Sequence, residues 1–241
     1  MILNLLRHGG DPLEILLILL LTVPIMLFAT SVHETAHGFV AKLFGDNTAY
    51  NLGRLTLNPI KHVDPIGLIS LLIFGYGWAK PVPINTRNFK NQKWGMAITA
   101  LAGPVSNLLM GVFCAVATGV ILGIYSYLTW INGPAFWITF TDVLSYACFY
   151  GALVNFVYMT FNMIPVPPFD GSRVALVFLP TKTYFAIMRY ERQIMIGTLV
   201  ALMVLSYFNF SPFGIVAQKL LDLIYVPVAN GTVTLLLNIL H

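Results

Sequence analysis

Two histidines and a glutamate stand close together in the stretch SVHETAHGFVAKLFGD, which begins at Ser31. His33 and His37 are four residues apart, so on a helix they project from one face, about one turn apart, where both imidazoles can bind one metal ion. Glu34 lies beside them, where its carboxylate can take a proton from a water that attacks a carbonyl group. This H-E-x-x-H spacing is typical of zinc peptidases, although soluble, charge-rich helices also carry it by chance.

The surrounding sequence favours a metal-binding motif over a chance occurrence of the same spacing. The motif directly follows LEILLILLLTVPIMLFAT, an apolar run that begins at Leu13 and contains one charged residue, Glu14. Ionisable groups at the end of such a run are costly inside a membrane, and proteins that keep them generally use them. A solvated polar helix face is hard to sustain in that position. We therefore expect a functional metal site.

A catalytic zinc site needs a third protein ligand and an open position for water. The chain offers few candidates: Asp46, His62, Asp64, Asp142 and Asp170. Asp142 is expected at the opposite end of its helix, and Asp46 fits a helix-ending turn or cap. Asp170 lies in the proline-rich turn IPVPPFDG at the expected membrane depth, and Gly171 after it permits tight backbone geometry. Asp170 is therefore the best candidate.

The composition predicts an all-α polytopic membrane protein. Of the 241 residues, 58% are hydrophobic and 9% are charged, whereas soluble domains carry about 25% charged residues. The formal charge of +4 comes mostly from basic residues between apolar runs, a pattern that indicates membrane orientation and contact with lipid rather than a nucleic-acid partner. Cys114 and Cys148 both lie in apolar segments, so a disulfide framework is not expected.

The apolar runs predict helices at residues 12–44, 94–128, 136–163 and 192–208. Residues 211–241 fit either one irregular span or a surface helix and a shorter span, which gives about five to six transmembrane helices in total. Between the first two helices, a short apolar run with polar flanks predicts a re-entrant element with a β-hairpin or edge strand, extended over residues 78–85. We expect one membrane-embedded domain over residues 1–241, with a catalytic core at 12–179 and additional C-terminal helices at 190–241.

The distribution of basic residues predicts the orientation of these helices. Residues 129–141 contain no Lys or Arg, whereas residues 42–93 contain Lys42, Arg54, Lys61, Lys80, Arg87, Lys90 and Lys93. The positive-inside rule then places the end of the first helix on the cytoplasmic side of a prokaryotic cell membrane. The third helix returns to the same side, so Asp170 is expected at the depth of His33 and His37.

Five stretches together resemble the site-2 protease family of intramembrane zinc metalloproteases: HETAH, LNPIKHVDPIG, GWAKPVPIN, AGPVSN and FNMIPVPPFDG. The resemblance spans residues 32–174 and is to the compact branch without an inserted PDZ domain. It implies one Zn²⁺ per chain, held by His33, His37 and Asp170, with Glu34 as the general base. It also implies that Asn162 steadies the substrate or the oxyanion, and that transmembrane proteins or peptides are the substrates.

Several alternatives remain open at the level of sequence. Asn162 also fits a C-terminal helix cap, and Asn107 fits a polar contact between helices. We interpret His62 and Asp64 as structural or as supports of the site. A metal transporter or metal-binding membrane protein would use the same ligands, but it would have no need of Glu34. An inactive relative is expected to lose Glu34 or a ligand. The stretch GWAKPVPIN also offers an edge strand that could pair with an unwound substrate.

Overall fold

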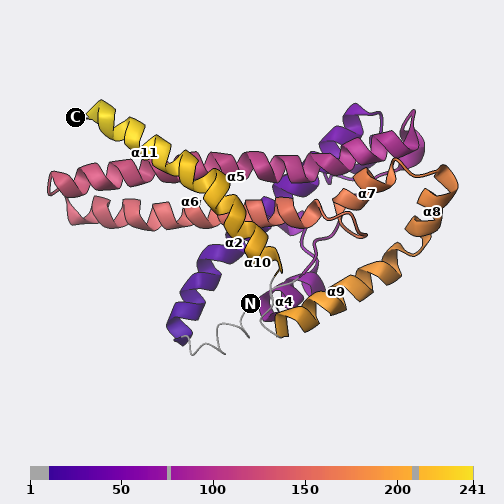
Figure 1. Ribbon diagram of the computed structural model, residues 1–241, viewed down its shortest axis with the longest axis horizontal. Helices are drawn as coiled ribbons and strands as arrows, with labels where there is room; N and C mark the ends of the chain where they lie inside the picture. The colour runs from indigo at the N-terminus through magenta and orange to yellow at the C-terminus, as the bar shows by residue number, and fades with distance from the viewer. Residues whose placement is uncertain (1–10, 75–76, 208–211, 241) are drawn as a thin grey trace.

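The fold was obtained as a computed structural model, which describes residues 11–74, 77–207 and 212–240. These residues are mainly helical (Figure 1). In chain order the helices are α2 (Pro12–Leu43), α3 (Thr48–Asn51), α4 (Pro65–Phe74), α5 (Gln92–Trp130), α6 (Ala135–Asn162), α7 (Asp170–Leu176), α8 (Thr181–Arg189), α9 (Glu191–Tyr207), α10 (Pro212–Leu220) and α11 (Val226–Leu240). Two 3₁₀ turns, η1 (Pro59–Lys61) and η2 (Thr86–Asn88), and one π-helical turn, η3 (Leu221–Tyr225), complete the described elements.

Four described helices are long and apolar enough to cross a membrane: Ile15–Leu43, Gln92–Trp130, Ala135–Asn162 and Gln218–Ile239. The helical class of the fold is thus confirmed. In the tail, Gln218–Ile239 is one irregular helical segment through η3 that is long and apolar enough for a span. Helix α9 has 17 residues, near the lower limit of about 17 for a span. The count of five to six spans therefore stays a prediction. Several positions of the predicted elements lie outside the described residues: 75–76 in the short apolar run, 208 at the end of the fourth helix, and 211 and 241 in the tail. Residues 1–10 and 209–210 of the predicted domain also lie outside them.

The first helix has the ends that its sequence predicts. Asp11 caps the N-terminus of α2 by accepting a hydrogen bond from the backbone N–H of Leu13 at 3.0 Å, and Pro12 occupies the first turn. The helix continues through Pro24 and ends just before Gly45, whose φ of +100° is favourable for glycine. The metal-binding motif is therefore carried on one unbroken helix.

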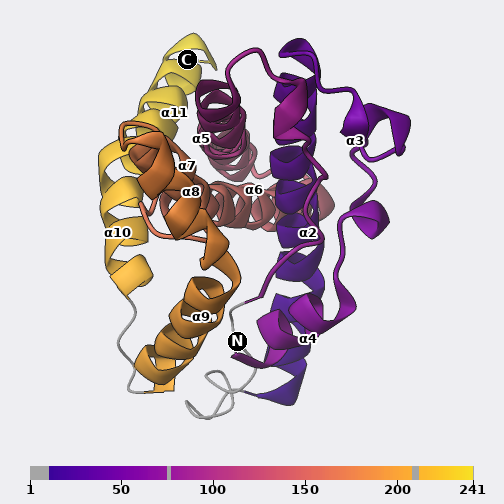
Figure 2. The ribbon, with the colours of Figure 1, turned by 90° about the vertical axis from the view of Figure 1, so that its right-hand side faces the viewer.

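Helices α5 and α6 run antiparallel along the long axis, and α2 and α11 cross them (Figure 1). Small residues on α5 permit this close packing. A Cβ atom added at Gly111 would lie 2.6 Å from the ring of Phe156 on α6, and one added at Gly119 would lie 2.5 Å from the carbonyl oxygen of Ala229 on α11. In the view of Figure 2, α2 to α4 lie on one side of α5 and α6, and α10 and α11 lie on the other.

The segment between α2 and α5 differs from its prediction. The apolar run forms the 10-residue helix α4, too short to span a membrane. Residues 77–85 are non-helical, as predicted, but in place of a hairpin the described residues form one isolated antiparallel bridge between Val63 and Ala79. Pro81 and Pro83 follow that bridge and have no N–H groups with which to extend a ladder.

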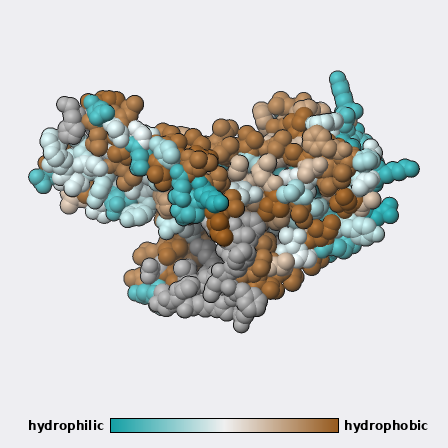
Figure 3. All heavy atoms as spheres, viewed as in Figure 1, coloured by the Kyte–Doolittle hydropathy of each residue, from teal (hydrophilic) through white to brown (hydrophobic). Residues whose placement is uncertain are grey.

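Hydrophobic and hydrophilic residues are unevenly distributed over the surface. Figure 3 shows hydrophobic residues over much of the visible face and hydrophilic residues toward both ends, including the right-hand end, where α5 begins and α7 and α8 lie. The right-hand end includes Lys93 at the start of α5, from the basic segment predicted to face the cytoplasm, and Lys182 at the start of α8. The end of α2, which carries the two histidines, approaches the same end of the molecule (Figure 1).

Candidate metal centre

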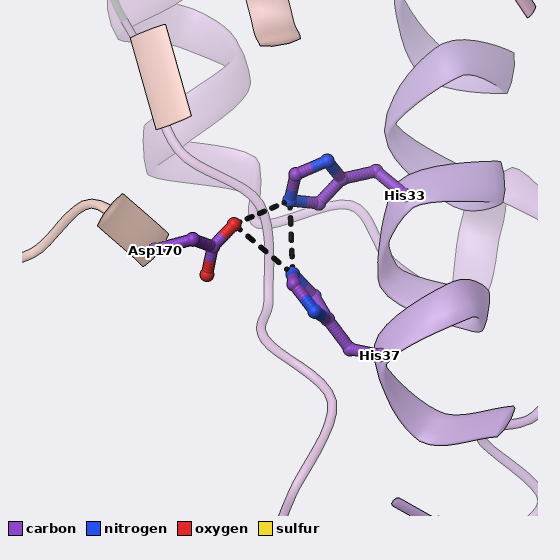
Figure 4. A group of neighbouring side chains, drawn as sticks. All are labelled: His33, His37 and Asp170. Atoms are coloured by element: carbon purple, nitrogen blue, oxygen red, sulfur yellow. Dashed lines mark hydrogen bonds and ion pairs between the residues drawn. The ribbon is translucent and has the colours of Figure 1, made fainter. Parts of the chain in front are cut away.

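Three side chains from two distant segments converge on one point (Figure 4). The Nε2 atoms of His33 and His37 are 3.0 Å apart, and Asp170 Oδ2 lies 3.1 Å from the first and 3.2 Å from the second. Both histidines are buried, and Asp170 is largely buried. The structure thus brings together the three residues that the sequence predicted as a metal-binding set.

Local backbone geometry presents these side chains to one another. The spacing of four residues places His33 and His37 on one face of α2. Asp170 occupies the first turn of α7, directly after the proline-rich turn. Gly171 packs against the backbone of Met163 and Ile164 at the end of α6 so closely that a side chain there would collide with their carbonyl groups. The tight turn allowed by Gly171 therefore brings Asp170 back toward α2.

Each imidazole is fixed through the nitrogen that faces away from Asp170. His37 Nδ1 donates a hydrogen bond to the carbonyl oxygen of Thr99 at 2.8 Å, and His33 Nδ1 donates one to Asn107 Oδ1. Both acceptors lie on α5. Because Nδ1 carries the proton in each neutral ring, each Nε2 directs a lone pair toward Asp170, as metal-binding histidines do.

The donor set fits a zinc ion. Apart from the two imidazole nitrogens, Asp170 Oδ2 is a buried oxygen without a hydrogen-bond partner among the described residues. Three acceptor atoms this close together repel one another unless a cation lies between them. Neighbouring ligands of tetrahedral zinc are about 3.3 Å apart, close to the separations found here.

Gly103 on α5 provides the space for both rings. A Cβ atom at this position would lie 2.5 Å from Cε1 of His33 and 2.5 Å from Cε1 and Nε2 of His37. Gly103 belongs to the AGPVSN stretch, whose small residues permit close packing of a helix. The structure shows that this close packing is between α5 and the two imidazoles.

The glutamate of the motif contacts the non-helical segment that precedes α5. Glu34 Oε2 accepts a hydrogen bond from the backbone N–H of Val82 at 2.8 Å. Arg54 Nη2 donates to the carbonyl oxygens of Lys80 and Pro81 at 2.8 and 3.2 Å. The segment that was predicted to be extended is therefore attached to α2 beside Glu34.

Asn162 ends α6, and its Nδ2 atom donates a hydrogen bond to the carbonyl oxygen of Tyr158 at 3.0 Å. This contact is local to the helix end, the alternative that the sequence left open. One amide hydrogen and Oδ1 remain outside this bond, so the predicted contact of Asn162 with substrate stays a prediction.

The other acidic and histidine candidates have structural contacts. Asp64 caps α4 by accepting hydrogen bonds from the N–H groups of Ile66 and Gly67 at 3.0 and 2.9 Å. Buried His62 donates through Nε2 to the carbonyl oxygen of Thr56 at 2.7 Å, and its Nδ1 atom has no partner among the described residues. Asp142 lies near the other end of α6 from Asn162, as expected.

Asp46 forms the turn that follows α2, as its sequence context predicted. Its buried carboxylate accepts hydrogen bonds from the N–H and hydroxyl of Thr48, from the N–H of Asn85 at 2.6 Å and from Nδ2 of Asn88 at 2.7 Å. Burial would raise the pKa of Asp46, but these hydrogen bonds lower it below its usual value. Asp46 therefore connects the end of α2 to the end of the segment that contacts Glu34.

Asn155 is a buried residue of the site region that sequence reasoning missed. Its Oδ1 atom accepts a hydrogen bond from Asn107 Nδ2 at 2.8 Å. The available signal was an amide inside an otherwise apolar helix, but the sequence did not indicate which face of α6 meets α5. The contact became evident only from the packing of the two helices.

Comparison with known proteins gives a consistent result. The family model described as Peptidase family M50 matches residues 21–206. "Putative zinc metalloprotease YwhC" of Bacillus subtilis is 38% identical over 169 residues, which cover 70% of this chain and 72% of the relative. A protein of Mycolicibacterium smegmatis with the same description, Rip2, is 28% identical over 166 residues, 66% of this chain and 58% of the relative. No solved structure matches the chain significantly.

Proposed function

The chain belongs to peptidase family M50, the site-2 protease family, and from this premise we propose that it cleaves peptide bonds in or near transmembrane segments of other proteins. It is a zinc metalloendopeptidase and an integral membrane protein. The observation that carries the proposal is the position of the His33, His37 and Asp170 cluster relative to the apolar helix α2. His33 and His37 lie 10 and 6 residues before the end of α2, roughly 15 and 9 Å along the helix axis.

In this proposal His33 Nε2, His37 Nε2 and one oxygen of Asp170 hold the zinc ion. A zinc ion supplies a Lewis acid that polarises the peptide carbonyl and lowers the pKa of the attacking water. The protein contributes the fixed orientation of the ligands, because the contacts with Thr99 and Asn107 prevent both rings from turning. A preorganised site of this kind requires little rearrangement during the reaction.

Glu34 is the proposed general base. The N–H of Val82 holds Oε2, which leaves Oε1 with its lone pairs for the proton of the attacking water. The same carboxyl group can then deliver that proton to the leaving amine. We also keep Asn162 in the proposal as a group that steadies the substrate or the developing oxyanion through its remaining amide hydrogen.

The non-helical segment at residues 77–85 is the proposed contact for the substrate backbone. A transmembrane helix protects its peptide bonds by internal hydrogen bonding, so it must unwind before cleavage. An extended segment beside Glu34 offers backbone groups to the unwound strand. This would select substrates by their ability to unwind near the membrane surface more than by their side chains.

For topology we propose the orientation predicted from the basic loops, with the site toward the cytoplasmic side of a prokaryotic cell membrane. We also propose that residues 1–241 form one domain. Two contacts support that proposal: α11 packs against Gly119 and Gly123 of α5, and Leu221 joins Ala152 and Phe156 of α6 in a buried cluster. The C-terminal helices would thus stabilise the catalytic core.

The test is Glu34→Gln, which keeps the size of the side chain and removes the base. Cleavage of a model transmembrane substrate in liposomes should fall about 10²- to 10⁴-fold, while zinc content measured on the same preparation stays at one ion per chain. Asp142→Asn removes a carboxylate at the far end of α6 and should change neither. A zinc-loaded Glu34→Gln protein that cleaves at the unmodified rate would refute the proposal.

A further inference from the structure

A chain of buried amide groups connects His33 to the interior of α6. His33 Nδ1 contacts Asn107 Oδ1, Asn107 Nδ2 donates to Asn155 Oδ1 at 2.8 Å, and Asn155 Nδ2 donates to the carbonyl oxygen of Gly151 at 2.8 Å. Asn107 has 0% of its surface exposed and Asn155 has 2%. The chain crosses three helices, α2, α5 and α6, in a region that the described structure shields from solvent.

The carbonyl group of Gly151, at the end of the chain farthest from His33, sets the direction of these hydrogen bonds. A backbone carbonyl can only accept, so the Gly151 carbonyl requires the NH₂ group of Asn155. Asn155 must then present Oδ1 to Asn107, which in turn must present its NH₂ group to Asn155 and its oxygen to His33. The Asn107 NH₂ group also faces the carbonyl oxygen of Ala29 at 3.5 Å, which favours the same orientation.

The partners of the two histidines differ in one respect. His37 faces the carbonyl oxygen of Thr99, a backbone group that cannot reverse its polarity. His33 faces a side-chain amide, which after a half-turn would present N–H groups instead of oxygen. A reversed Asn107 would favour a proton on Nε2 of His33, the nitrogen that faces Asp170. The site therefore needs something that keeps Asn107 in one orientation.

We propose that Asn107 and Asn155 are positioning residues that form a directional relay, anchored on the Gly151 carbonyl, which keeps the Nδ1 atom of His33 protonated and its Nε2 atom free for the metal. The inference rests on the proposed metal-binding role of His33. Asn155 acts only through Asn107, so its loss should weaken metal binding without removing any ligand.

The test measures zinc affinity of the purified protein in detergent by competition with a chelator. Asn107→Leu removes the acceptor of His33 and should weaken zinc binding about 10- to 100-fold, the usual effect of losing such a partner. Asn155→Leu should weaken it by a smaller factor. Thr141→Val is the matched control, because Thr141 is also buried on α6 but donates only within its own helix. The zinc affinity of Thr141→Val should match that of the unmodified protein.

The decisive variant combines Asn155→Leu with Asn107→Asp. A carboxylate has no N–H group to present, so it accepts from His33 Nδ1 in either orientation and no longer needs Asn155. Zinc affinity should therefore recover relative to Asn155→Leu alone. The absorption spectrum of the cobalt-substituted protein should also return to its unmodified form. Loss of packing at position 155 would not be repaired by a carboxylate on another helix.

Two results would overturn the relay: unmodified zinc affinity in Asn155→Leu, or a double variant that binds zinc no better than Asn155→Leu. The outcome is independent of cleavage. A protein that binds zinc with the expected pattern but cleaves no transmembrane substrate would refute the proposed function and leave the relay intact. If Asn107→Leu fails to fold, the zinc affinities of Asn155→Leu and of the Asn107→Asp, Asn155→Leu double variant still test the relay.

Discussion

Gly103→Ala offers a direct test of how the two imidazoles are accommodated. The added Cβ atom would lie 2.5 Å from ring atoms of both His33 and His37, whereas carbon atoms in contact are about 3.5–4.0 Å apart. Ring atoms or helix axes must therefore move by about 1 Å, which exceeds the tolerance of about 0.2 Å in metal–ligand distances. Overpacking of this kind costs about 1–3 kcal/mol, so zinc affinity should fall about 5- to 150-fold.

The assay is chelator competition on purified protein, with thermal unfolding of the metal-free protein measured in parallel. Gly231→Ala is a control without a clash, because no atom lies within 4 Å of the added carbon. Gly111→Ala overpacks the same helix against Phe156, away from the histidines, and should lower stability without a comparable loss of zinc affinity. Unmodified zinc affinity in Gly103→Ala would show that the rings have more room than the structure indicates.

Three further changes have defined outcomes. Asp170→Ala should leave purified protein without zinc by elemental analysis while the helical circular dichroism persists, and full zinc occupancy would exclude Asp170 as a ligand. Val82→Pro removes the N–H that binds Glu34 Oε2 and should slow cleavage without zinc loss, whereas Val82→Ala should not. Asp46→Asn should lower stability by about 1–3 kcal/mol at neutral pH. Because the folded-state pKa of Asp46 is lowered, its contribution is present above the unfolded-state value of about 3.9 and is lost as the pH falls through the lower folded-state value, so thermal unfolding of Asp46→Asn should lack that pH dependence.

The proximity of His33, His37 and Asp170 could be predicted from sequence because it depends on local geometry and on topology. A spacing of four residues places His33 and His37 on one helix face wherever that helix lies. The count of apolar segments returns the chain to the same membrane side before Asp170. Neither step requires knowledge of how the helices are rotated against one another. The family was predicted from the same motifs, and the comparisons confirm it.

The supporting contacts could not be predicted, because they depend on helix rotation and on competition between local preferences. Asn155 meets Asn107 only because one face of α6 packs on α5. The segment between the first two helices was predicted to contain a hairpin or an edge strand, but Pro81 and Pro83 limit the described pairing to one bridge. The segment is positioned by Arg54, Glu34 and Asp46 instead, three side chains whose partners are backbone groups distant in sequence.

These three contacts bear on how a hydrolase can operate below the surface of a membrane. Hydrolysis needs water and polar backbone groups at a depth where the surrounding helices are apolar. Asp46 fixes the segment at the end of α2, and the Val82 N–H binds Glu34 about three turns deeper along the same helix. The segment therefore runs from the turn after α2 back to Glu34, the proposed general base. Polar backbone inside a membrane is tolerated where protein surrounds it, so the proposed function predicts that this segment forms one wall of the site.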